Sequence, residues 1–148
     1  MANLLTLTSA QPTKTLEAGE VLIAEGEPGG DLFVLQSGKF IVERGGVVVA
    51  TISAEGALIG EMSVLLGTEN TATVRAQTPA AVRVVHNPLA FLERQPLAAL
   101  RVAMLLSQRL DATSALLVEL SKEAHQAAEQ GAFHRLMSAL MTNPPGKG

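Results

Sequence analysis

The stretch that decides the fold runs from residue 59 to residue 76 and reads IGEMSVLLGTENTATVRA. Gly60 lacks a Cβ and permits a tight entry into the element that follows it. Residues 61–66 are predicted to form a short helix that ends at Gly67. Residues 71–76 alternate β-branched side chains and are predicted to form a strand. The backbone N–H groups at this helix start therefore face a loop and a strand, an arrangement that accepts an anion such as a phosphate.

The composition is that of one globular domain with an aliphatic core. The chain has 148 residues, of which 47% are hydrophobic, 17% charged and 3% aromatic. The net charge of −3 and the scarcity of aromatic side chains argue against a nucleic-acid partner, whose binding needs a basic excess and base-stacking rings. The absence of cysteine excludes disulfides, thiolate metal sites and cysteine nucleophiles, and it fits a reducing compartment.

The N-terminal region carries no targeting signal that we recognise. Residues 1–10 lack a basic region ahead of their apolar residues, so a secretory signal peptide is not expected. No apolar run approaches the ~18 residues of a membrane span. We therefore expect a cytoplasmic protein that has no membrane partner.

The first part of the chain is predicted to consist of short antiparallel strands. Glycine-rich turns separate apolar segments about every ten residues, a spacing typical of an all-β barrel or sandwich. Residues 1–15 are weakly patterned, and we expect a short arm or helix there. Residues 16–23 are expected to form a turn that leads into a strand, and the other expected strands are residues 31–36, 40–43, 47–52, 71–76 and 80–86.

After residue 86 the pattern becomes helical. Asn87-Pro88 has the signature of an N-cap followed by proline at the first helical position, and it predicts a short helix through Glu93. Gln95-Pro96 repeats that signature and opens a long helix that we expect to end near Gln130.

The C-terminal end is expected to differ from the rest of the chain. Gly131 should break the long helix, residues 133–141 should form a last short helix, and residues 143–148 should be a disordered tail. The expected organisation is therefore a domain over residues 1–130, which includes the long helix, and a C-terminal segment over residues 131–148.

The long helix carries an apolar seam that favours a parallel homodimer. Its members follow the alternating spacing of four and three residues that is typical of a coiled coil. The alternative is a helix that packs only on its own barrel, although Leu105, Ala112 and Leu116 already offer a second apolar face for that purpose. The seam consists of Leu106, Leu110, Thr113, Leu117, Leu120, Ala124 and Ala127.

Residues 60–63, Gly-Glu-Met-Ser, followed by residues 71–76, Thr-Ala-Thr-Val-Arg-Ala, resemble the phosphate-binding cassette of cyclic nucleotide-binding domains. The glycine-acid pairs within residues 18–27 and the aspartate-led strand of residues 31–38 also match that family, so the resemblance covers about residues 16–121. It implies an eight-stranded antiparallel jelly-roll barrel with short helices and a long C-terminal dimer helix.

The resemblance also implies a ligand site. Glu61 would accept a hydrogen bond from a ribose hydroxyl, and the alternative is an acid that is merely favoured by the helix dipole. The expected ligand is cAMP or cGMP, and no other cofactor or metal is expected. The candidate ligand-binding residues are Gly60, Glu61, Met62, Ser63, Asn70, Thr71, Ala72, Arg109, Thr113 and Ser114.

Asn70 departs from the family pattern, which has an arginine at this position. Arginine forms a bidentate, charge-assisted pair with phosphate, whereas asparagine offers a neutral amide. Losing a buried charged partner costs about 2–5 kcal/mol, or roughly 30-fold to several thousand-fold in affinity. A micromolar site would thus weaken to tens of micromolar or to millimolar. The alternative is a barrel that has lost its ligand.

Arg109 is the candidate replacement for the missing arginine. The segment that contains Arg109, Thr113 and Ser114 resembles the dimer helix of bacterial cAMP receptor proteins, where the matching Thr-Ser pair contacts adenine and the matching Arg lies near the phosphate. The alternative is that these residues are ordinary helix residues and that Arg109 pairs with Glu61 in an empty pocket.

Other classes of protein find little support in the sequence. His86, His125 and His134 lack ligand spacing, and no catalytic motif is present, so neither a metal centre nor an enzyme is expected. Glu25, Glu27 and Asp31 are interpreted as a solvated loop. Residues 131–148 are too short for the winged helix-turn-helix of DNA-binding relatives.

Two functions remain in view. The first is a stand-alone cyclic nucleotide sensor whose long helix closes over the base and signals through the dimer to an unidentified downstream protein. The second is a barrel that binds no nucleotide and serves as a dimerisation or docking scaffold.

Overall fold

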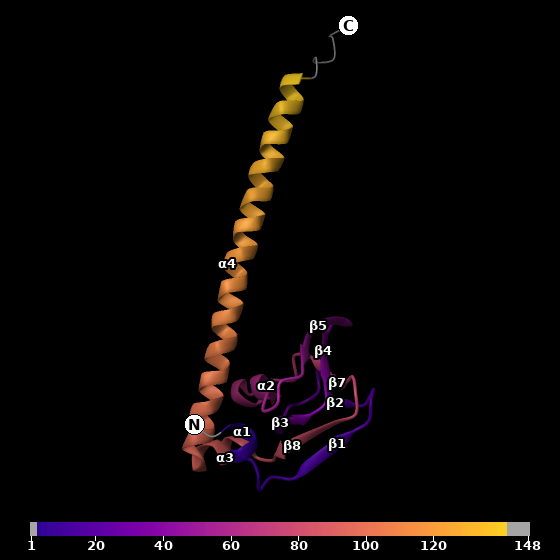
Figure 1. Ribbon diagram of the computed structural model, residues 1–148, viewed down its shortest axis with the longest axis vertical. Helices are drawn as coiled ribbons and strands as arrows, with labels where there is room; N and C mark the ends of the chain where they lie inside the picture. Colours follow the sequence, from indigo (N-terminus) through magenta and orange to yellow (C-terminus); the bar gives the residue numbers. More distant parts are fainter. Residues whose placement is uncertain (1–2, 142–148) are drawn as a thin grey trace. The chain divides into compact units, whose positions relative to one another are not determined.

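The computed structural model describes residues 3–141 and contains eight antiparallel strands in two four-stranded sheets (Figure 1). No strand pairing joins the two sheets within these residues, so the expected jelly roll of eight strands is confirmed but its sheets do not close. The first sheet has the order β1 (Thr13–Leu16), β8 (Ala80–Val85), β3 (Leu32–Ser37) and β6 (Leu58–Ile59). The second has the order β2 (Val21–Ile23), β7 (Thr73–Ala76), β4 (Phe40–Arg44) and β5 (Val47–Ile52).

The hydrophobic core lies between the two sheets, because both contribute buried side chains to one cluster. Side chains alternate between the two faces of a strand, so each sheet turns one apolar face toward the core. In β7, Val74 and Ala76 are buried, while Thr73 and Arg75 point to the other face and are half-buried. Strand β3 is buried over four consecutive residues, and it also contacts helices α1 (Leu4–Leu7) and α2 (Glu61–Leu66). The core includes Leu16, Phe33, Leu35, Ile59, Val82 and Val84 from the first sheet and Ile23, Phe40, Val74 and Ala76 from the second.

The N-terminal arm contains a strand that the sequence did not predict. Helix α1 begins after Asn3, whose Oδ1 accepts a hydrogen bond from the backbone N–H of Thr6. The chain then forms β1, which pairs antiparallel with β8. Its first three residues are exposed and only Leu16 is buried, so the strand shows no apolar alternation that sequence reasoning detects.

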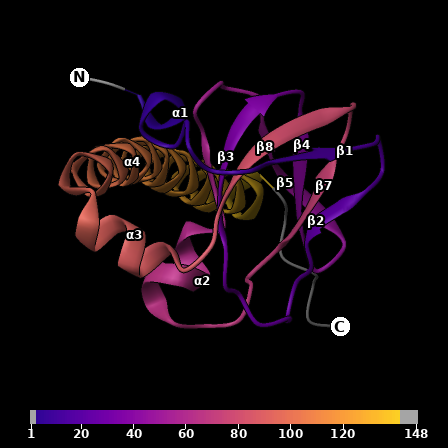
Figure 2. The same cartoon turned by 90° about the horizontal axis from the view of Figure 1, so that it is seen from below.

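The short helices α2 and α3 (Pro88–Arg94) lie side by side (Figure 2). Asn87 precedes α3 as expected, but it adopts the left-handed conformation with φ 49° and its side chain makes no capping hydrogen bond. Asparagine tolerates this conformation better than most residues. Helix α3 is thus started by backbone geometry and by Pro88, not by a side-chain cap.

Helix α4 (Pro96–Met141) is continuous over 46 residues, so the expected break at Gly131 is wrong. One glycine inside a helix costs only about 1 kcal/mol relative to alanine. The residues around Gly131 include Ala128, Gln130 and Ala132, which are good helix formers and outweigh that penalty. The expected disordered tail, residues 143–148, lies outside the described residues.

The chain divides into two compact units, Met1–Ala103 and Met104–Gly148. In the described residues, the second unit is the C-terminal part of α4, and it carries exposed apolar side chains. At about 100° per residue, Phe133 and Leu140 lie roughly 120–160° round the helix from Leu110 and Leu117. The expected seam is therefore not continued beyond Ala127. None of the helices in the described part of the chain is long and apolar enough to cross a membrane.

Candidate functional site

The cassette begins at the end of β6, where Gly60 turns the chain into α2. Gly60 has φ 88°, a left-handed conformation that side chains with a Cβ rarely adopt. A Cβ there would also come within 3.0 Å of the carbonyl oxygen of Asp31. Helix α2 runs from Glu61 to Leu66 and ends at Gly67, also left-handed, as the sequence predicts. This turn fixes Glu61 as the first residue of the helix.

The first turn of α2 places two polar side chains inside the protein. Glu61 and Ser63 are each 7% exposed, whereas Met62 is 51% exposed. The Ser63 hydroxyl donates to the carbonyl oxygen of Gly60 over 3.2 Å. Carboxylates are rarely this buried, so Glu61 stays a candidate site residue.

Asn70 holds the preceding loop against the cassette. Its Nδ2 donates to the carbonyl oxygen of Ala24 over 3.1 Å, and its backbone N–H donates to Glu27 O over 2.9 Å. Its own carbonyl oxygen accepts from the N–H of Gly26 over 2.8 Å. Asn70 therefore ties residues 24–27 to the cassette.

Gly29, in the same loop, lies against the side chains of Ser63 and Asn70. A Cβ at Gly29 would lie 2.7 Å from Ser63 Cβ and 3.1 Å from Asn70 Oδ1, so the loop backbone presses directly on both side chains. Pro28 and Glu69 also form an isolated antiparallel bridge. Ser63 and Asn70 thus both lie against the same side of Gly29, although they are seven positions apart in the sequence.

An open cleft of about 440 Å³ lies beside this contact. Glu61, Asn70 and Thr71 are not among its lining residues, and no lysine or arginine lines it. The cleft therefore borders the cassette loop without containing the predicted ribose acceptor. Its lining consists of Pro28, Gly29, Gly30, Ser63, Val64, Gly67, Thr68, Glu69, Asn87, Pro88 and Leu89.

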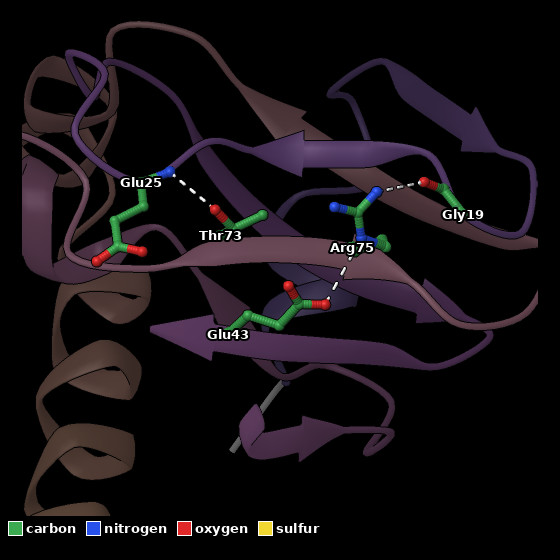
Figure 3. Close-up of polar contacts among 5 residues, drawn as sticks. All are labelled: Gly19, Glu25, Glu43, Thr73 and Arg75. Carbon is green, nitrogen blue, oxygen red and sulfur yellow. Dashed lines mark hydrogen bonds and ion pairs between the residues drawn. The ribbon is translucent and has the colours of Figure 1, made fainter. Parts of the chain in front are cut away.

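The strand that follows the cassette carries an arginine that is already engaged (Figure 3). Arg75 donates to the carbonyl oxygen of Gly19 over 3.0 Å, and its Nε lies 3.6 Å from a carboxylate oxygen of Glu43. On the same strand, Thr73 Oγ1 accepts from the N–H of Glu25 over 3.1 Å. These contacts hold β7 to its neighbours and leave Arg75 bound to protein groups.

The predicted site residues fall into both units. Gly60–Ser63 and Asn70–Ala72 belong to the first unit. Arg109, Thr113 and Ser114 belong to the second unit, on α4, where all three are exposed. Arg109 and Thr113 lie on one face of the helix because they are four positions apart. A role for these three residues at the ligand site stays a prediction.

Sequence reasoning missed the part that the loop of residues 24–31 has in the site. Glu25 and Glu27 are exposed, which agrees with their interpretation as part of a solvated loop, but the backbones of Ala24, Glu27 and Gly29 also contact the cassette. Asp31 Oδ1 lies 3.0 Å from His86 Nδ1. The signal that was available is the Pro28-Gly29-Gly30 run, since glycine permits close approach of a backbone to a neighbouring group. Among the described residues, no group of three or more His, Asp or Glu side chains is placed to hold a metal ion.

The sequence matches the model of the cyclic nucleotide-binding domain over residues 13–94. It is 36% identical over 75 residues to cGMP-dependent protein kinase, isozyme 1, of Drosophila melanogaster, a match that covers 51% of this chain and 10% of that protein. It is also 36% identical over 105 residues to an uncharacterized ABC transporter ATP-binding protein of Mycobacterium tuberculosis, covering 67% of this chain and 31% of that protein. The chain thus spans only a small part of these relatives' length.

Two solved structures are similar in fold. The catabolite activator protein of Thermus thermophilus gives a TM-score of 0.67 at 29% identity, covering 78% of this chain and 57% of that chain. The regulatory subunit of a cAMP-independent protein kinase A from Trypanosoma brucei gives a TM-score of 0.58 at 25% identity, covering 70% of this chain and 39% of that chain.

Proposed function

The chain belongs to the cyclic nucleotide-binding domain family, and from that premise we propose that it is a regulatory sensor of a ribose-bearing purine ligand, without catalytic activity of its own. The observation that carries the proposal is Glu61, a carboxylate that is 7% exposed at the start of α2. A buried carboxylate accepts a charge-assisted hydrogen bond from a ribose 2′-hydroxyl. The proposed ligand site consists of Gly60–Ser63 and Asn70–Ala72, with Glu61 as the acceptor.

The affinity for cAMP or cGMP is proposed to be weak. Asn70 offers an amide in place of a guanidinium, and its Nδ2 already donates to Ala24 O. On the basis of the lost charged pair, about 2–5 kcal/mol, a dissociation constant of tens of micromolar to millimolar is expected. Arg109 is proposed to restore part of the loss, and Thr113 and Ser114 are proposed to contact the base.

Ligand binding is proposed to change a homodimer formed by α4. An unidentified downstream protein in the cytoplasm is proposed to recognise that change. The apolar seam from Leu106 to Ala127 supports this proposal, because its members are spaced for a parallel coiled coil. A ligand changes the dimer only to the extent that it binds one arrangement of α4 more tightly than another.

A second candidate function is a dimerisation and docking scaffold that binds no nucleotide. One observation favours it: Asn70 makes three hydrogen bonds to the loop of residues 24–27, so this residue already has a purely structural task. On this proposal the cassette is retained because it holds the loop, and the seam of α4 carries the function.

Isothermal titration calorimetry of the native chain with cAMP, cGMP, adenosine and guanosine separates the two candidates. The sensor proposal expects saturable one-site binding of at least one of the four. Thermal unfolding is measured with the same ligands, because a ligand that binds the folded state raises the Tm. If none of the four ligands at millimolar concentration gives a binding heat or a shift in Tm, the sensor proposal is rejected and the scaffold function is favoured.

A further inference from the structure

The turn between β4 and β5 has a backbone N–H that its own hairpin does not use. Arg44 and Val47 are paired across the hairpin, and the two residues between them, Gly45 and Gly46, have φ 58° and 79°. Two positive φ angles are typical of the turns that connect hairpins through two residues. In such a turn the hydrogen bond joins the two flanking residues, so the N–H of Gly45 is left for water or for another group.

Glu25 binds that N–H from a loop that is twenty positions away in the sequence. Gly45 N lies 3.0 Å from Oε2 and 3.4 Å from Oε1 of the Glu25 carboxylate, which accepts the hydrogen bond. Strand β5 lies at the edge of its sheet, where β4 is its neighbour. The Glu25 carboxylate therefore ties the tip of an edge hairpin to the loop of residues 24–27.

The backbone of Glu25 is held from the cassette side. Its N–H donates to Thr73 Oγ1 over 3.1 Å (Figure 3). Thr73 is the first residue of β7, the strand that continues the cassette. The neighbours of Glu25 in the loop, Ala24 and Gly26, form hydrogen bonds with Asn70. Glu25 is thus bound to the cassette strand through its backbone and to the hairpin turn through its carboxylate.

We propose that Glu25 is a positioning residue that couples the cassette to the β4–β5 hairpin. Because the backbone of Glu25 is fixed by Thr73, a change at the cassette strand moves the carboxylate and alters its bond to Gly45. Strand β7 also pairs directly with β4, which is a second connection that does not involve Glu25. The coupling needs no ligand, so it goes beyond the proposed function and holds for the sensor and the scaffold alike.

Hydrogen exchange of the Gly45 amide, measured by NMR on the full chain, tests the contact. Glu25→Gln loses the charge but keeps an acceptor, whereas Glu25→Leu loses both. Because the bond is exposed and its net strength is modest, exchange should be roughly two- to tenfold faster in Glu25→Leu than in Glu25→Gln. Glu27→Leu, in the same exposed loop, is the matched control and should stay within about 1.5-fold of the native rate. Equal rates in Glu25→Leu and Glu25→Gln would overturn the inference.

A substitution on the cassette strand tests the coupling. Thr73→Val removes the acceptor for the Glu25 N–H and should speed Gly45 exchange at least about twofold. In a Glu25→Leu background the same substitution should change the rate by less than about 1.5-fold, because the connection is already broken. Thr73→Ser keeps the hydroxyl and should restore the native rate.

The Lys39 amide provides the reference for these rates. It donates to Thr78 Oγ1 over 3.0 Å, so it is also held by a side chain from another loop, and it lies in the connection between β3 and β4. Its exchange should not respond to Thr73→Val. An equal rise at Lys39 and Gly45 would show a general loosening of the fold and would contradict the coupling. An equal effect of Thr73→Val with and without Glu25 would assign the coupling to strand pairing and would also overturn the inference.

Discussion

Substituting alanine for Gly29 tests whether the loop of residues 24–30 and the cassette form one wall. The new Cβ would lie 2.7 Å from Ser63 Cβ, well inside van der Waals contact, and Ser63 is buried. Overpacking of this kind costs about 1–3 kcal/mol. For a unit of about this size, 1 kcal/mol lowers the Tm by about 4–8 °C, so a fall of roughly 5–20 °C is expected for Gly29→Ala.

Gly30→Ala is the matched control. A Cβ at Gly30 would meet no atom within 4 Å, and neither glycine has a positive φ, so both substitutions lower the entropy of the unfolded chain alike. Thermal unfolding followed by circular dichroism is the assay. In a Ser63→Gly background the contacting side chain is absent, and Gly29→Ala should then be at least about 1 kcal/mol less destabilising. Equal Tm values for Gly29→Ala and Gly30→Ala would refute the close contact.

Three further predictions concern the cassette amide, the candidate cation and the dimer seam. Asn70→Ala removes the hydrogen bond to Ala24 O and should lower the free energy of unfolding by about 0.5–1.5 kcal/mol in urea denaturation; no change would mean that the amide does not hold the loop. Arg109→Ala should lower the affinity for cAMP and leave that for adenosine unchanged; an unchanged cAMP affinity removes Arg109 from the phosphate. Leu117→Lys should convert the proposed dimer to a monomer in sedimentation velocity, while Phe133→Lys, comparably exposed but about 160° round the helix, should not. Dissociation by both substitutions, or by neither, would contradict a seam on that face.

The sequence predicted the elements of the fold wherever a local signal was strong. Glycines at positions 60 and 67 bracketed α2, and Gln95-Pro96 marked the start of α4. Strand β1 escaped prediction because its pairing with β8 determines it, not an apolar pattern of its own. The continuity of α4 through Gly131 escaped because the penalty for one glycine is smaller than the propensity of its neighbours.

The sequence predicted which residues belong to the candidate site, but it did not predict the contacts that they make. The sequence marked Glu61 and Asn70, but it did not reveal that Asn70 binds the backbone at Ala24 and Glu27. Hydrogen bonds to backbone groups more than forty positions away depend on chain topology and leave no pattern in the sequence. The sequence did not reveal the role of Gly29 for the same reason, because that role depends on the close approach of Ser63 and Asn70 to the position of a Cβ.

The most direct test of the central claim is the calorimetric affinity of the native chain for adenosine compared with 2′-deoxyadenosine, and for cAMP compared with 2′-deoxy-cAMP. A hydrogen bond from the 2′-hydroxyl to the Glu61 carboxylate is worth about 1.5–3 kcal/mol, so removing the hydroxyl should weaken binding about 10- to 150-fold. Equal affinities within each pair would contradict the assignment of Glu61 as the ribose acceptor, and with it the sensor site.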